Sequence, residues 1–306
     1  MRVLIVTNMY PTPTEPAFGS FVKDQADDLR SLGLDVEEVA FDGRARSTEY
    51  GRAVGVVRRT LSAGRFDIVH AHYGLSGAVA ALARPRVPLV TTFHGDDYQG
   101  PAWQRWISIA VARRSAAIMV SERGRRRLFT RHAAVIPMGV DTKLFTPVEQ
   151  ADARRRLGWD EEGHYALLAG ARRNPVKGAA LFDAAVEHVP ELRGVTLEGF
   201  SRADVAFALN AADVLVVAST REGSPVTVRE SLACTTPVVA VPVGDVPTVL
   251  AGLPGCAVVA RDPRVLADAI REALDAGRDP SLRQRAEETS REAVVRRVVG
   301  VYEGLL

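Results

Sequence analysis

The hydrophobic positions of this chain form short apolar runs that alternate with longer segments of helical periodicity. Residues 3–8 and 66–72 have the length and apolar character of buried strands, whereas residues 21–33 space their apolar positions as an amphipathic helix does. Strands that alternate with helices in this way are typical of a parallel sheet covered by helices. The pattern therefore predicts the α/β class.

This alternation occurs twice, separated by a polar, proline-containing segment near residues 145–149. It restarts at residues 165–171 and continues to a terminal series of helices. We expect two Rossmann-like, doubly wound parallel-sheet domains at residues 1–147 and 148–290. Residues 291–306 are expected to form a terminal helix that packs back on the first domain.

The composition is that of an ordinary globular protein and excludes a disordered, collagenous or membrane-spanning chain. Of 306 residues, 47% are hydrophobic and 25% are charged. The apolar run within Met1–Tyr10 resembles a buried strand rather than a signal peptide, which favours a cytoplasmic location. Cys234 and Cys256 are too few for a disulfide framework and lack metal-ligand spacing.

Positive charge is concentrated in the first half of the chain. Residues 1–147 carry 20 Lys and Arg against 14 Asp and Glu. The densest run, from Arg113 to Arg131, favours a phosphate-bearing acceptor or peripheral contact with the inner face of an anionic membrane. A solvated helix face is the alternative. Nucleic acid is not expected, because no interleaved aromatic residues or nucleic-acid module accompanies the run.

The loop after the first strand indicates which ligands the first domain does not bind. It is long and rich in proline, whereas a dinucleotide fold would have GxGxxG there, so a nicotinamide oxidoreductase is disfavoured. Gly19 directly precedes a helix, whose free backbone N–H groups favour a phosphate. A plain helix-entry role for this glycine is the alternative.

Two glutamates in the second half lie eight positions apart in the segment EGSPVTVRE. Glu222 is expected in a loop, and Glu230 on a helix that begins near Ser224 and Pro225, a capping serine and a proline suited to the first turn. Carboxylates accept hydrogen bonds from paired hydroxyl groups, so the two could hold a sugar ring and a ribose. Taken alone, two glutamates at this spacing are more often surface residues.

With these segments in view, the chain resembles the retaining family 4 glycosyltransferases of the two-domain GT-B type over almost its whole length. EGSPVTVRE is similar to the family's E-x7-E motif, GARRNPVKG to its basic donor-phosphate motif, and AAVIPMGVD to its interdomain strand and turn. FHGDD and the opening loop with Gly19 also match. The resemblance implies a GT-B architecture in which an acceptor domain and a nucleotide-sugar donor domain face a central cleft.

The resemblance also implies roles for individual residues. Glu230 would bind the donor ribose and Glu222 the transferred sugar, while Arg172 and Lys177 would hold the donor pyrophosphate. Surface charge is the alternative for the two cations. The remaining donor contacts implied are Gly19, Gly199, Phe200, Gly223, Ser224, Pro225 and Val226.

On the first domain, the resemblance places His94 against the transferred sugar, with Asp96 or Asp97 orienting the acceptor. A structural histidine is the alternative for His94. His70 and His72 alternate at a strand end, and packing or acceptor contact is favoured over a metal because no third ligand is evident. No metal and no cofactor are expected, since cations and helix termini replace the metal at the pyrophosphate.

The chain departs from the family pattern after the E-x7-E motif. Thr235 and Asp245 stand where the family has glycines, and Thr248 stands where it has a glutamate. Residue roles are therefore not transferred to this last loop. The segment at Gly199–Ser201 is the expected place for the nucleobase, with Phe200 either stacking on it or packing in the core.

We expect a retaining, hexosyltransferase-type enzyme that moves a sugar from a nucleotide diphosphate sugar to an acceptor hydroxyl. A UDP-sugar is favoured over a GDP-sugar. The expected acceptor is a lipid-linked sugar, a polysaccharide or a small metabolite, and the arginine-rich first half of the chain favours the first. Two alternatives remain: a nucleotide-sugar 2-epimerase, and a catalytically silent subunit that binds sugar nucleotides.

Overall fold

The computed structural model describes residues 1–12, 15, 18–43 and 46–306, which form two units. The first unit contains Met1–Met138 and Val294–Leu306, and the second contains Gly139–Ala293. Pro13 and Pro16 of the opening loop lie outside the described residues.

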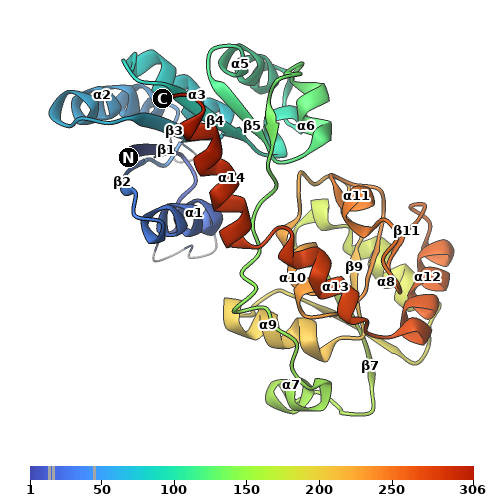
Figure 1. Ribbon diagram of the computed structural model, residues 1–306. Helices are drawn as coiled ribbons and strands as arrows, with labels where there is room; N and C mark the ends of the chain where they lie inside the picture. Colours follow the sequence, from blue (N-terminus) through green and yellow to red (C-terminus); the bar gives the residue numbers. More distant parts are fainter. Residues whose placement is uncertain (13–14, 16–17, 44–45) are drawn as a thin grey trace. The chain divides into compact units, whose positions relative to one another are not determined.

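The first unit is built on a six-stranded sheet in the order β2-β1-β3-β4-β5-β6, and all of its strands run parallel (Figure 1). Its strands are β1 Arg2–Thr7, β2 Asp35–Ala40, β3 Ile68–His72, β4 Leu89–Phe93, β5 Ala116–Met119 and β6 Ala134–Val135. Its helices are α1 Ser20–Ser31, α2 Thr48–Ala63, α3 Gly74–Ala83, α4 Asp96–Gln99, α5 Ala102–Ala112, α6 Glu122–Arg127 and most of α14 Arg291–Glu303. The strand order reverses between β1 and β3, where an open α/β sheet binds its ligands.

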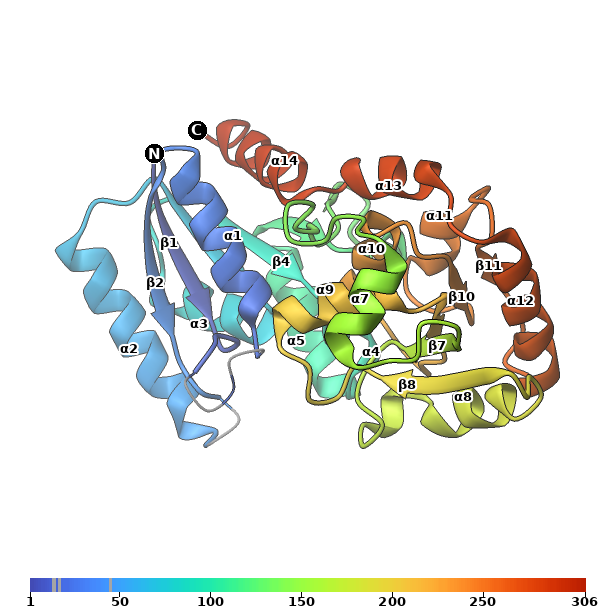
Figure 2. The same ribbon diagram turned by 90° about the horizontal axis from the view of Figure 1, so that it is seen from below.

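Helix α14 completes the core of the first unit although it is the last element of the chain. Val294, Val298 and Tyr302 are buried in one cluster with strand residues of β1 and β3 and with the apolar face of α1. Figures 1 and 2 both show α14 beside α1. The Tyr302 hydroxyl also bonds the buried ring of His70 on β3, with 2.6 Å between Oη and Nδ1. The first unit is therefore closed by residues from both ends of the sequence.

The second unit has a five-stranded parallel sheet in the order β11-β10-β9-β7-β8. Its strands are β7 His164–Leu168, β8 Leu192–Thr196, β9 Val214–Val217, β10 Val238–Ala240 and β11 Ala257–Val258. Its helices are α7 Gln150–Leu157, the short 3-10 helix η1 Pro175–Lys177, α8 Ala179–Val186, α9 Arg202–Ala211, α10 Val226–Ala233, α11 Val246–Leu250, α12 Pro263–Ala276 and α13 Pro280–Glu287. The order reverses between β7 and β9, so the loops after these two strands meet at the switch point.

Both chain segments that join the units run side by side in the second unit. Val140 and Ser290 form a parallel bridge, in which the Val140 N–H donates to the Thr289 carbonyl and the Arg291 N–H donates to the Val140 carbonyl. Asp141 and Arg291 add an ion pair at 3.4 Å. The α/β class and the two parallel sheets expected from the sequence are confirmed. Over the described ranges, no helix combines the length and apolarity needed to cross a membrane.

Candidate functional site

The loops after β7 and β9 are joined by an ion pair between two residues that the sequence singled out. Lys177 Nζ donates to Glu222 Oε1 at 2.7 Å, and the Ser219 hydroxyl donates to the same oxygen at 2.8 Å. The Thr220 N–H donates to the Val176 carbonyl at 2.8 Å, which fixes the two backbones together. An ammonium group and a carboxylate therefore lie together at the switch point of the second sheet.

Two glycines allow these loops to approach so closely. Gly170 has a φ of 146°, and a Cβ placed there would lie 2.7 Å from Lys177 Cγ, so the lysine stem crosses over the glycine. At Gly178, which has a φ of 72°, a Cβ would lie 2.0 Å from the Ala218 carbonyl oxygen. A larger residue at Gly178 would push the Lys177 loop away from the Glu222 loop, and one at Gly170 would displace the stem of Lys177.

Arg172 lies in the same loop as Lys177 but is engaged elsewhere. Its guanidinium donates to the Asp183 carboxylate on α8, and both side chains are exposed. The structure thus brings Lys177 to Glu222, while Arg172 pairs with Asp183. An exposed ion pair costs little to separate, so Arg172 is readily available to another anion.

Glu230 lies on α10, as expected, and its side chain is only 8% exposed. Arg202 at the start of α9 approaches it, with 3.9 Å between Nη2 and Oε1. Helix α10 begins at Val226 with Pro225 as its N-cap, and no side chain caps it. The first-turn N–H groups and the positive end of the helix dipole are therefore directed into the loop that contains Glu222, as a phosphate site requires.

Ser224 does not cap α10, contrary to the sequence expectation, because its hydroxyl is hydrogen-bonded to Asp245. The Ser224 hydroxyl donates to Asp245 Oδ2 at 2.9 Å, and the buried Arg229 donates to the same oxygen at 2.6 Å. Asp245 thus ties the loop after β10 to the loop that follows Glu222. Gly244 packs beside it, since a Cβ there would lie 2.5 Å from the Gly223 carbonyl oxygen.

The group formed by Ser224, Arg229 and Asp245, which holds the two loops together, is not predicted from the sequence. Asp245 was recognised only as a departure from the family's glycine, and its partner Arg229 was not singled out. Arg261 was also missed, although its guanidinium donates to the carbonyl groups of Ala218 and Ser219 and so supports the Glu222 loop. Arg261 follows β11, a two-residue strand that the sequence analysis does not predict, so the local pattern carries no signal for it.

The two residues expected near the nucleobase have different surroundings. Gly199 is exposed, has a φ of 86°, and has open space where a Cβ would stand. Phe200 is partly buried and packs against the main core cluster of the second unit. Core packing thus accounts for one side of the phenylalanine ring.

In the first unit, three histidines gather at the carboxyl ends of β3 and β4. His72 Nδ1 and His94 Nε2 are 3.4 Å apart, and the rings of His70 and His72 are 4.5 Å apart. Burial lowers the pKa of His94 to about 4 and that of His70 to about 3, and lowers the pKa of His72 well below its usual range. All three rings are therefore neutral at pH 7.

Gly19 begins the turn of α1 whose Phe21 packs against His94. It is the N-cap of α1 with a φ of 67°, and a Cβ there would lie 2.3 Å from the Met9 carbonyl carbon. Two residues later, the Phe21 ring packs against the His94 ring at 4.9 Å between centroids. The turn at Gly19 thus positions the Phe21 ring that packs on one side of His94.

Asp96 and Asp97 are placed very differently. Asp96 is exposed at the start of α4, whereas Asp97 is fully buried. The Asp97 carboxylate accepts hydrogen bonds from the backbone N–H groups of Gly74 at 2.7 Å and His94 at 2.6 Å. It therefore fixes the backbone of His94 against α3, which leaves Asp96 as the exposed carboxylate of the pair.

The chemistry that these groups support is anion and polyol binding. Among the described residues, no three His, Cys, Asp or Glu side chains are arranged to hold a metal ion. The second unit offers a lysine, an uncapped helix terminus and two partly buried carboxylates at one sheet edge. These are groups that bind a diphosphate and the hydroxyls of sugars.

Comparison with known proteins identifies the family. The model described as Glycosyltransferase Family 4 matches residues 2–144, and the model described as Glycosyl transferases group 1 matches residues 162–276. The D-inositol 3-phosphate glycosyltransferase of Mycobacterium leprae is 30% identical over 79% of this chain and 68% of its own length. The chain belongs to the family 4 glycosyltransferases. This family 4 chain spans 60% to 71% of the lengths of eight curated relatives that it matches.

Solved structures show that this family 4 chain has the GT-B fold. Sucrose-phosphate synthase from Thermosynechococcus elongatus superposes with a TM-score of 0.84 at 19% identity, covering 99% of this chain and 98% of that one. Anabaena HepE in complex with UDP superposes with a TM-score of 0.76 at 16% identity over the full length of both chains. HepE has also been solved with UDP-glucose, with a TM-score of 0.71.

Proposed function

We propose that this family 4 chain transfers a sugar from a nucleotide diphosphate sugar to an acceptor hydroxyl, with retention at the anomeric carbon. The observation that carries the proposal is the Lys177–Glu222 pair at the switch point of the second sheet. In an E-x7-E glycosyltransferase this is where the diphosphate and the transferred sugar would lie. A UDP-sugar is the proposed donor, which is supported by HepE, whose structures contain UDP and UDP-glucose.

The departing diphosphate is the group that this site would stabilise. As the bond from the anomeric carbon to the diphosphate breaks, negative charge grows on the leaving oxygen, and Lys177 with the first turn of α10 would stabilise it. Arg172 would add a second cation once it leaves the exposed Asp183. A phosphate oxygen of the leaving group would take the proton of the acceptor hydroxyl, which attacks the same face of the sugar.

Glu222 and Glu230 act in this proposal as binding groups. Glu222 would accept hydrogen bonds from hydroxyls of the transferred sugar, and the hydrogen bond from Lys177 orients its carboxylate. Glu230 would accept from the ribose hydroxyls. In the first unit, the neutral His94 would offer a ring nitrogen to the transferred sugar, and the exposed Asp96 would contact the acceptor.

For the acceptor, we infer a lipid-linked sugar, because the excess of cations lies in the first half of the chain. The experiment for the whole proposal is a thermal-shift panel of nucleotides and nucleotide sugars, followed by product analysis of the donor that binds best. Release of UDP that requires an acceptor supports transfer. Conversion of the donor alone would indicate an epimerase, and binding without any product would indicate a silent subunit.

A further inference from the structure

Two arginine-rich helices of this chain differ in how their charge is compensated. Helix α7 contains the run Arg154–Arg156, and each arginine reaches a carboxylate: Asp213 at 2.9 Å, Asp152 at 2.9 Å and Asp204 at 3.9 Å. Its positive charge is neutralised within the second unit. An arginine run on a helix is thus not by itself an anion site in this protein.

Helix α6 and the turn after it carry a similar run, of which only part of the charge is compensated. Arg125 pairs with Glu122 at 2.8 Å, but in the part of the chain that the structure describes Arg126 and Arg131 form no ion pair. Residues 102–132 contain eight arginines and one acidic residue, Glu122. The segment therefore presents a strong excess of positive charge to solvent.

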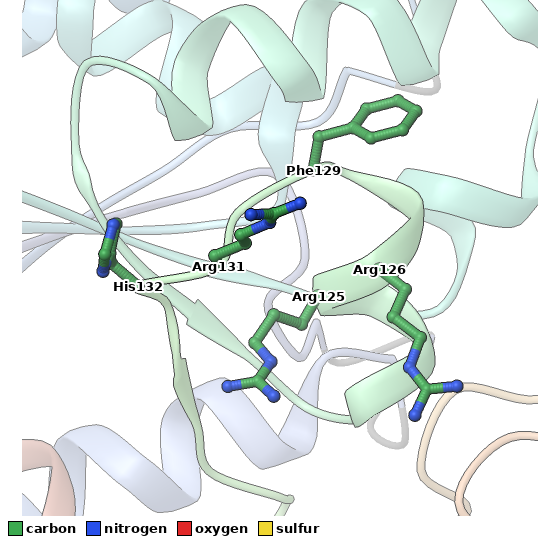
Figure 3. A pocket seen from close by; sticks show the side chains of 5 residues that line it. All are labelled: Arg125, Arg126, Phe129, Arg131 and His132. Atoms are coloured by element: carbon green, nitrogen blue, oxygen red, sulfur yellow. The ribbon is translucent and has the colours of Figure 1, made fainter.

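Three of these cations line an open pocket of about 600 Å³. Figure 3 shows Arg125, Arg126 and Arg131 around it, spreading from α6 and the turn that follows the helix. Phe129 lines the same pocket, is 69% exposed, and has a φ of 56°, which is unfavourable for a residue with a side chain. An exposed phenylalanine held in a strained conformation between arginines contributes nothing to the core of this unit.

Helix α5 adds two exposed tryptophans to the same side of the sheet. Ile109 of α5 and Leu128 at the end of α6 are buried in one core cluster, so both helices cover the same face and their outward sides face away from it. Figure 1 shows the two helices next to each other. Trp103 and Trp106 are 58% and 61% exposed, one turn apart on the outward side of α5.

We infer that this surface docks the chain onto an anionic lipid bilayer. The surface consists of Trp103, Trp106, Arg125, Arg126, Phe129 and Arg131. Tryptophan prefers the headgroup level of a bilayer, and unpaired arginines are attracted to anionic headgroups. Charge complementarity favours a bilayer, and the exposed aromatic rings favour it over a soluble polyanion, because rings gain free energy only where there is apolar material to enter. This docking builds on the proposed function, because it would bring the chain to the membrane that holds a lipid-linked acceptor. Binding to the bilayer does not itself require sugar transfer.

The test is co-sedimentation of the full chain with vesicles of phosphatidylcholine alone and of phosphatidylcholine with phosphatidylglycerol, without any donor present. We expect binding to the anionic vesicles only. Arg126→Gln with Arg131→Gln should weaken it on the order of thirtyfold. The matched control, Arg155→Gln with Arg156→Gln, removes the same net charge from α7 and should leave binding unchanged. Trp103→Ser with Trp106→Ser should also weaken binding, and all of these side chains are exposed, so folding is preserved.

Three outcomes would overturn the inference. Equal binding to neutral vesicles would show that anionic lipid is not what the surface recognises. Equal weakening by the two pairs of glutamine substitutions would show that binding depends on the net charge of the chain and not on this surface. Competition by glycerol phosphate or a DNA duplex, at the phosphate concentration of the vesicles, would show that the surface takes a soluble anion instead. Sugar-nucleotide turnover is measured separately, so a chain that docks without turnover refutes the proposed transfer and leaves the docking intact.

Discussion

Lys177 Nζ lies 2.7 Å from Glu222 Oε1, although the two residues are separated by 45 positions in the sequence. They come from the loops after β7 and β9, which the strand order brings together at the switch point of the second sheet. The pair therefore links the segment similar to the family's phosphate motif with the segment similar to its E-x7-E motif. Each side chain orients the other before any ligand is bound.

Replacement of Lys177 tests the proposed diphosphate site most directly. Lys177→Ala removes the cation expected to stabilise the leaving group and should lower kcat on the order of a hundredfold. Lys143→Ala, at an exposed position of the same unit, is the matched control and should retain activity. Turnover by both variants at the wild-type rate, measured as UDP release, would remove Lys177 from the chemistry.

Asp245 should stabilise the second unit through Arg229. Asp245→Ala leaves a buried guanidinium without its carboxylate and should lower the free energy of unfolding by about 3 kcal/mol. Arg229→Met in the same chain should restore most of that loss, because no buried charge then remains. Urea denaturation of both variants measures this, and additive losses in the double variant would show that the two residues act independently.

The histidines of the first unit should make its stability sensitive to acid. Because burial depresses their pKa, to about 3 for His70 and about 4 for His94, the unfolded chain binds protons near pH 6.5 while the folded chain does not. Stability should therefore fall as the pH drops from 6.5 toward 4, by about 1.4 kcal/mol per unit for each histidine. Asp97 opposes this across the whole range, since burial raises its pKa from the ordinary 3.8 to about 7 and the folded chain therefore binds a proton there that the unfolded chain does not.

The measurement is the urea midpoint of the first unit as a function of pH. His70→Gln should reduce the acid sensitivity by the contribution of one group, even if the variant is less stable at every pH. A pH dependence identical to that of the wild-type chain would show that folding does not lower the pKa of His70.

Gly19 and Gly33 form a matched pair for the turn before α1. Both have a positive φ, of 67° and 82°, but only Gly19 has backbone atoms where a Cβ would stand. Gly33→Ala should cost about 1 kcal/mol of stability, the effect of the left-handed conformation alone. Gly19→Ala should cost more and should displace Phe21 from His94. Thermal denaturation compares the two, and equal losses would contradict the close approach to Met9.

Much of this fold follows from the sequence because parallel α/β sheets are dictated by local patterns. Apolar runs such as residues 3–6 have the length and the β-branched content of buried strands, and proline and glycine positions mark the loops between them. The position of Glu230 on a helix and of Glu222 before it follows from the same local reasoning. Local reasoning is wrong at Ser224, which was expected to cap α10 but whose hydroxyl donates a hydrogen bond to Asp245.

Partners that are distant in the sequence could not be predicted in this way. The pairing of Arg229 with Asp245, and of His70 with Tyr302, depends on side-chain directions that only the packed structure fixes. The same holds for Asp97, whose burial follows from the donors around it rather than from its neighbours in the chain. The assigned donor and acceptor contacts remain predictions until a bound ligand is observed.

The return of α14 to the first unit separates the order of synthesis from the order of folding. A ribosome completes every residue of the second unit before it makes Val294, Val298 and Tyr302. During synthesis, the first unit therefore cannot complete its core until α14 has been made. Until then, part of its apolar interior is uncovered and the His70 ring lacks its hydroxyl partner, although every residue of the second unit is already present. A chain truncated before Val294 would keep that part of the apolar interior uncovered and leave the His70 ring without its hydroxyl partner.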